Sequence, residues 1–217
     1  MRRTYYVNGA EQPWSAASQT WLADNLPFLV RRSGVSAVER VSQIAEAKGV
    51  SAVLDEIRLL TSDAVRGQYF RALLATGSLD AAEADATLRL AADDVDSSLE
   101  LGSILRTAVT VDLQDTYAFF SAARRISSSA ETSGLLERVL EQSELSPARQ
   151  VDLLAVAAAI ESDAARADVL DAFITRHPHV VDPVRAALLA ALQTVDSRVE
   201  RERLRERVRT ATTGTVY

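Results

Sequence analysis

The chain of 217 residues contains no cysteine, one methionine and two histidines. Without cysteine it has no disulfide, no thiolate nucleophile and no zinc–thiolate site. It also has only eight glycines and five prolines, which leaves room for long helices. The longest apolar run, Leu153–Ile160, has eight residues, far fewer than the ~20 that span a bilayer. We therefore expect a helical segment that does not insert into a membrane.

Lysine is nearly absent: Lys48 stands beside 23 arginines, and the formal net charge is −6. Residues 1–34 carry +2 and residues 197–217 carry +3, so the centre of the chain carries −11. Duplex nucleic acid is normally bound by a basic stripe that neutralises several phosphates. The acidic centre makes nucleic acid an unlikely partner.

Aromatic residues make up only 6% of the chain, and five of the twelve fall within its first 28 residues. Tyr5-Tyr6-Val7 favours a strand, and Asn8-Gly9 supplies the two positive-φ positions of a type I′ turn. We therefore predict a β-hairpin over residues 1–14 and a helical-repeat domain over residues 15–217. Because a lone hairpin is marginal in water, we expect it either to pack on the first helix or to belong to a sheet that lies upstream in a longer protein.

An internal repeat dominates the helical domain. A serine follows an aliphatic residue by two positions five times, at steps of 35, 31, 34 and 35 residues, and an apolar pair comes seven and eight residues after each of the first four. A period of this length without strand signals is typical of stacked helical hairpins. The sequence thus predicts an all-α fold, a HEAT- or TPR-like α-solenoid of antiparallel hairpins over residues 51–212, with a polar capping helix over 197–210. The serines are Ser62, Ser97, Ser128, Ser162 and Ser197.

Helix starts follow from capping residues. Second helices are predicted to begin at the five serines, and Ser36 with Glu39 to form a capping box before an earlier helix. Pro27 is expected to kink or split the helix that begins after Ser15. The first helices of the hairpins are predicted to begin at Ser51, Asp80, Asp112, Ser146 and Asp182.

Catalytic patterns are missing. The chain has no Walker loop, no Gly-x-Gly-x-x-Gly, no His-Glu-x-x-His and no Gly-x-Ser-x-Gly elbow. His177 and His179 could form a metal pair with Asp182, but His-x-His lacks further ligands of fixed geometry, and a solvated loop explains the pair better. We predict that the protein is not an enzyme and holds no metal or cofactor.

One recurrence points to a surface. Arginines stand four and nine residues after the serines, and equivalent positions of stacked hairpins line up along one face. In the later repeats the charge at the nine-residue position changes from positive to negative, because this position is occupied by Glu137, Asp171 and Glu206. A solvated face is the simpler interpretation, and a binding groove is the functional one. The candidate interaction residues are Arg66, Arg71, Arg106 and Arg166.

The chain also contains a set of short motifs. They are Tyr5-Tyr6-Val7-Asn8-Gly9, Trp21-Leu22, Leu26-Pro27, Arg32-Ser33-Gly34, Arg40-Val41, Leu60-Thr61-Ser62-Asp63 and Ile160-Glu161-Ser162-Asp163. Together these motifs resemble the C-terminal helical-repeat region of bacterial proteins that carry a membrane-embedded metallopeptidase of the beta-lactam-sensor type. The resemblance covers nearly the whole chain and implies a sensing or docking module. It brings no catalytic residue, because the metallopeptidase motif is absent here.

The function predicted from these features is a non-enzymatic protein–protein interaction or regulatory module that displays a curved helical-repeat surface to a protein or peptide. The alternative is a nucleic-acid-binding repeat that uses the arginine row. We expect a soluble segment, favour the cytoplasm, and keep open that it belongs to a larger membrane-anchored protein.

Overall fold

The computed structural model describes residues 4–213 and has, over that range, twelve α-helices and one two-stranded antiparallel sheet. The fold is therefore all-α with a short N-terminal hairpin, as the sequence predicts. The strands are β1 (Tyr5–Val7) and β2 (Ala10–Gln12). The helices are α1 (Ala16–Ser33), α2 (Ala37–Lys48), α3 (Val50–Arg58), α4 (Asp63–Ala75), α5 (Ala81–Asp94), α6 (Ser98–Thr110), α7 (Tyr117–Ala123), α8 (Ser129–Gln142), α9 (Pro147–Ala157), α10 (Asp163–Arg176), α11 (Asp182–Gln193) and α12 (Arg198–Thr213).

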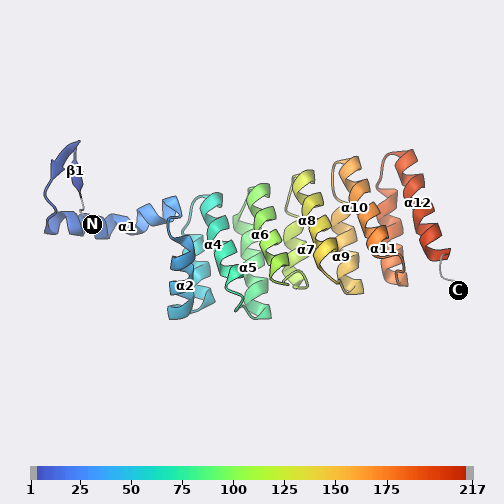
Figure 1. Cartoon of the computed structure of the whole chain (residues 1–217), viewed down its shortest axis with the longest axis horizontal. Helices are drawn as coiled ribbons and strands as arrows, with labels where there is room; N and C mark the ends of the chain where they lie inside the picture. The colour runs from blue at the N-terminus through green and yellow to red at the C-terminus, as the bar shows by residue number, and fades with distance from the viewer. Residues whose placement is uncertain (1–3, 214–217) are drawn as a thin grey trace.

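The helices from α2 onward stack side by side in two layers (Figure 1). One layer consists of α3, α5, α7, α9 and α11, and each helix packs against the next member of its layer. The other layer, called here the second-helix layer, consists of α2, α4, α6, α8, α10 and α12, and it is packed in the same way. Helices that follow one another in the chain also touch across the layers, which makes each repeat a helical hairpin. This is the open stack expected of an α-solenoid.

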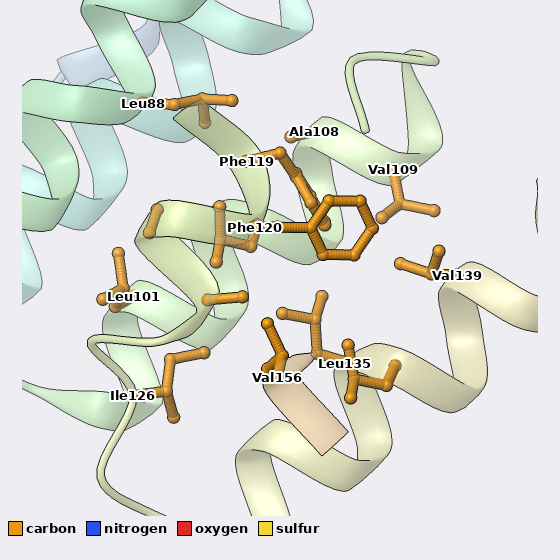
Figure 2. Close-up of a cluster of buried hydrophobic side chains, with 14 of the residues drawn as sticks. Leu88, Leu101, Ala108, Val109, Phe119, Phe120, Ile126, Leu135, Val139 and Val156 are labelled. Carbon is orange, nitrogen blue, oxygen red and sulfur yellow. The ribbon is translucent and has the colours of Figure 1, made fainter. Parts of the chain in front are cut away.

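The core lies between the two layers. Both members of all four predicted apolar pairs are fully buried, and so is Leu204, which stands seven residues after the fifth serine. In the middle of the stack, α7 contributes Phe119 and Phe120, whose rings meet edge to face with centroids 5.1 Å apart. Figure 2 shows these rings among apolar side chains from the neighbouring helices. Fully burying one side chain of this size contributes about 1.5–3 kcal/mol, so packing between adjacent repeats stabilises the stack.

The N-terminal arm, defined here as residues 4–33, projects from the end of the stack (Figure 1). Its hairpin has the predicted turn, with φ of 51° at Asn8 and 83° at Gly9. The hairpin packs on α1 through Tyr5, whose ring lies 6.5 Å from that of Trp14 and 6.0 Å from that of Trp21. The arm is thus a small unit of its own at one end of the molecule.

The predicted helix starts are partly confirmed. The five repeated serines directly precede α4, α6, α8, α10 and α12. Asp80 forms a complete capping box with Glu83 at the start of α5, and Ser146 caps α9. The serine pattern therefore locates the second helices correctly.

Other predicted starts are wrong. Gly49 ends α2 and precedes α3 directly, with φ of 82°, so Ser51 falls inside α3. Asp112 lies in a turn with φ of 59°, and α7 begins only at Tyr117. By contrast, α11 begins at Asp182 as predicted, although the residue in the cap position is Val181. Ser36 has a left-handed φ of 57° and makes no capping bond, so the predicted box with Glu39 does not form.

Pro27 neither ends nor splits α1, which runs unbroken from Ala16 to Ser33. A proline removes one helical N–H donor. The carbonyl that this donor would serve belongs to Ala23, which is exposed, so water replaces the lost bond. Over the described residues, none of the helices is long and apolar enough to cross a membrane.

Candidate interaction surface

Side chains directly after the repeated serines tie each repeat to the next. The backbone N–H groups of Asp96 and Ser97, in the turn before α6, donate to Asp63 Oδ2 of α4 at 3.0 and 2.8 Å. At the far end, the N–H groups of Asp196 and Ser197 donate to the carboxylate of Asp163. These bonds satisfy donors that a helix start leaves unpaired.

In the middle of the stack, serine hydroxyls accept the equivalent hydrogen bonds from backbone N–H groups. The N–H of Ser127 donates to Ser98 Oγ, and the N–H of Ser162 donates to Ser129 Oγ, both at 3.1 Å. We call this series, from α4 to α12, the turn ladder. Arg198 occupies the equivalent position on α12, where a guanidinium has no acceptor to offer a further repeat.

The bonds in the turn ladder also affect ionisation. The two N–H donors from Ser197 and Asp196 lower the pKa of the Asp163 carboxyl, and Arg166 adds a smaller effect in the same direction. Hydrogen bonds to a carboxylate favour its charged form. Sequence reasoning missed these residues, although a polar acceptor directly after four of the five serines was a visible signal.

Two of the four candidate arginines, Arg66 and Arg166, stand four residues after their serines and bind loop carbonyls. Arg166 is nearly buried and donates from Nε to the carbonyl of Ile160 at 3.0 Å. Arg66 donates to the carbonyl of Asp94 at 2.9 Å and pairs with Asp63 at 3.1 Å. Both guanidinium groups therefore hold the turns that separate the repeats.

The other two, Arg71 and Arg106, form a second ladder between neighbouring helices. Arg71 of α4 pairs with Glu100 of α6, and Arg106 of α6 pairs with Glu131 of α8, each at 2.7 Å. Both glutamates stand three residues after a cap serine. Their backbone N–H groups donate to those serines, and their carboxylates accept from arginines of the preceding helix in the same layer.

Glycines make room for these carboxylates. A Cβ at Gly67 would collide with Glu100 Oε2, and a Cβ at Gly102 would lie 2.8 Å from Glu131 Oε2. Both glycines stand five residues after a repeated serine. Their position inside helices costs about 0.5–1 kcal/mol each relative to alanine, so close approach of the next helix explains their presence.

The predicted change from positive to negative charge along the row begins at Glu137 in α8. Glu137 lies near Asp168 and Glu141, and burial, followed by these two like charges, raises the pKa of the Glu137 carboxyl. Further on, Asp171 pairs with Arg203 and Arg207 of α12. The structure thus brings the four arginines onto one layer in two separate rows, and each of them has a partner within the chain. Their use as a binding groove remains a prediction.

The histidines lie at the end of α10. The ring of His177 lies on that of Phe173, with centroids 4.9 Å apart. Burial, with help from the Arg176 charge, lowers the pKa of His177. Among the described residues there is no group of three or more side chains that could hold a metal ion.

Two open grooves lie at the N-terminal end of the stack. The first, called the α2–α4 groove, has a volume of about 650 Å³ and runs along the second-helix layer. Its floor includes Val38, Ala72 and Ala75, and Gln68 and Arg71 line it with polar groups. The side chain of Val38 is 62% exposed and is therefore accessible to a partner.

The second, called the arm groove, has a volume of about 760 Å³ and separates α1 from the turn between α3 and α4. Phe28 of α1 and Leu59 after α3 both line it, and each is more than half exposed. Arg32 lies over the Phe28 ring at 6.0 Å from its centroid, within the range of a cation–π contact.

No protein-family model, curated protein or solved structure matches this chain.

Proposed function

We propose that the protein is a non-enzymatic interaction module that binds a protein or peptide partner in the α2–α4 groove. The observation that carries the proposal is the groove itself, an apolar floor with polar side chains on a rigid layer of helices. Peptide segments are commonly recognised by such grooves, which take up apolar anchors while polar groups fix direction. The sensing or docking role implied by the resemblance agrees with this proposal.

The ladders support the same view, because they fix the shape of the groove. Arg71 lines the groove and is held by Glu100 on the next helix. Thr107 of α6 lines it as well. A surface that is ordered before binding loses less conformational entropy on association. The partner would therefore meet a preformed site.

The nucleic-acid alternative has less support. All four arginines that would form its basic row are bonded to carboxylates or carbonyls of the chain itself. A phosphate backbone would have to displace these partners. We expect the protein to pass through a heparin column at low salt, whereas salt-dependent retention would favour the alternative.

The groove is tested by comparing binding partners of three proteins in quantitative affinity capture. The groove variant combines Val38→Asp with Ala75→Lys. Val38 is the second residue of α2 and Ala75 is the last residue of α4, so both new charges suit the helix dipoles and the fold is kept. The control is Val199→Asp, which also changes an exposed valine at the second position of a helix.

We expect proteins captured by the natural chain to be retained by the control and lost by the groove variant. Circular dichroism establishes that all three are equally folded. Equal capture by the groove variant and the natural chain would remove the α2–α4 groove from the proposal. Capture of nothing by any of the three would contradict an interaction module.

A further inference from the structure

Several large apolar side chains of α1 are exposed to solvent. Trp21 is 48% exposed and Phe28 is 59% exposed, and Leu26 and Leu29 are also exposed. The arm is fastened to the stack near its C-terminal end, where Arg31 pairs with Glu56 of α3. An isolated helix of about this length is marginal in water without tertiary packing. This combination is expected of an interface, because exposed apolar patches of this kind mark association sites.

The exposed residues form a seam. Ala17, Trp21, Asp24, Phe28 and Arg32 follow one another at spacings of three or four residues, so they share one face of α1, and all five are exposed. Val35 follows the helix after Gly34, which ends it with a left-handed φ, and is also exposed.

The seam borders the arm groove. Asp24, Phe28 and Arg32 line that groove together with Leu59 on the opposite wall. The groove is therefore an open trough lined by apolar and hydroxyl side chains, one acidic group and two basic groups, of which Arg31 is already paired with Glu56. Such a set is self-complementary, because Asp24 and Arg32 of one copy can pair with Arg32 and Asp24 of a second copy.

We propose that α1 of a second copy lies antiparallel in the arm groove, around a twofold axis at Phe28. In this register the two Phe28 rings meet at the axis. Asp24 of each copy lies opposite Arg32 of the other, and Trp21 of each lies opposite Val35 of the other. The three kinds of pair nearest the axis are thus apolar with apolar or acid with base. A twofold interface requires this kind of self-complementary surface.

The size of the contact sets the expected strength. An 18-residue helix is ~27 Å long, and half-exposed Trp21 and Phe28 in two copies offer on the order of 400 Å² of surface. With Leu59 and Val35 the total remains below the ~1,000 Å² of a stable interface, and so we expect a weak, reversible dimer with a dissociation constant on the order of 100 µM. The inference does not depend on the proposed function, because the arm groove and the α2–α4 groove share no lining residue.

The test is sedimentation velocity on the full chain, over concentrations from about 1 to about 200 µM. We expect the average mass to rise from monomer towards dimer. The variant Phe28→Asp places two like charges at the axis and should weaken dimerisation at least tenfold, whereas Leu189→Asp, an exposed leucine on α11, should leave it unchanged. A natural chain that stays monomeric at every concentration would overturn the proposal, even if another protein were found in the groove.

A charge exchange tests the register. Asp24→Arg and Arg32→Asp should each weaken the dimer, because each places like charges opposite one another. The double variant restores both pairs and should restore dimerisation. Failure of this rescue, with α1 still folded by circular dichroism, would refute the antiparallel arrangement.

Cross-linking gives an independent readout. Since the chain has no cysteine, Phe28→Cys can form a disulfide only with its counterpart in another copy. We expect rapid oxidation to a covalent dimer for Phe28→Cys and not for Leu189→Cys. Equal oxidation rates of the two variants would contradict an axis at Phe28.

Discussion

Replacing Glu56 with glutamine should loosen the N-terminal arm and leave the rest of the stack folded. Glu56 accepts two bonds from Arg31 of α1, at 2.9 and 2.8 Å, and one from Arg40 of α2, at 2.8 Å. Its side chain is 10% exposed, whereas those of Arg31 and Arg40 are 33% and 31% exposed. Bonds to a charged group contribute about 1.5–3 kcal/mol each when buried. Solvent screening of the arginines reduces the sum, so we expect a total loss of roughly 2–3 kcal/mol.

The tryptophans make this loss measurable. Both tryptophans of the chain, Trp14 and Trp21, lie in the arm. Their fluorescence therefore reports on the arm, while far-ultraviolet circular dichroism reports mainly on the helices of the stack. In urea, Glu56→Gln should lower the fluorescence midpoint and leave the main circular dichroism transition nearly unchanged, because repeats are stabilised chiefly by their neighbours. The neighbouring exposed Asp55, replaced by asparagine, serves as the control.

Acid should release the arm as well. The hydrogen bond from Arg31 is the main cause that lowers the pKa of the Glu56 carboxyl, and the bond from Arg40 lowers it further. A carboxyl with a lowered folded-state pKa stabilises the fold fully above its ordinary pKa of 4.5, and this contribution is lost as the pH falls through the folded-state value. The natural chain should lose arm stability in that acidic range, and the glutamine variant should lack this step. Equal urea midpoints for both proteins at neutral pH would refute the role of Glu56.

Three further substitutions test the packing and the two ladders. Phe120→Ala should cost about 3–5 kcal/mol of unfolding free energy in urea, since Phe120 is buried at the centre of the stack; a cost below ~1 kcal/mol would contradict that packing. Gly67→Ala gains about 0.5–1 kcal/mol of helix stability but displaces the Glu100 carboxylate. Its net effect on unfolding free energy should therefore be near zero in the natural chain and stabilising in a Glu100→Ala background. Equal effects in both backgrounds would contradict the close approach of Glu100 to Gly67. Asp63→Ala removes the acceptor of two N–H groups, one of them from Ser97, and should cost about 2 kcal/mol and accelerate amide hydrogen exchange at Ser97; unchanged exchange would contradict the turn ladder.

Much of the fold could be predicted because its signals are local and periodic. The serines and the apolar pairs recur with the repeat, and the apolar pairs are the most buried positions of the second helices. The failed predictions depend on backbone geometry that residue type does not fix. Ser36 and Asp112 both adopt positive φ, which a capping pattern does not reveal, and each prediction of a cap at these residues was wrong.

The partners of the arginines could not be predicted from local sequence. Arg71 finds Glu100 on the next helix, 29 residues away, and Arg106 finds Glu131, 25 residues away. Only the stacking of the helices decides that these positions meet. The exposure of Phe28 has the same origin, since an aromatic residue in an amphipathic helix ordinarily predicts a buried face. That no helix of the stack packs over this face of α1 is evident only once the position of the stack is known.

The most direct test of the account compares the arginines with the α2–α4 groove in a single capture experiment. The account predicts that Arg66→Ala with Arg166→Ala, two arginines outside the groove, lowers the unfolding temperature and keeps the partners of the natural chain, whereas Val38→Asp with Ala75→Lys keeps the unfolding temperature and loses those partners. The opposite outcome, loss of partners from the arginine variant at unchanged stability, would show that the arginine row is the binding surface and would contradict the account.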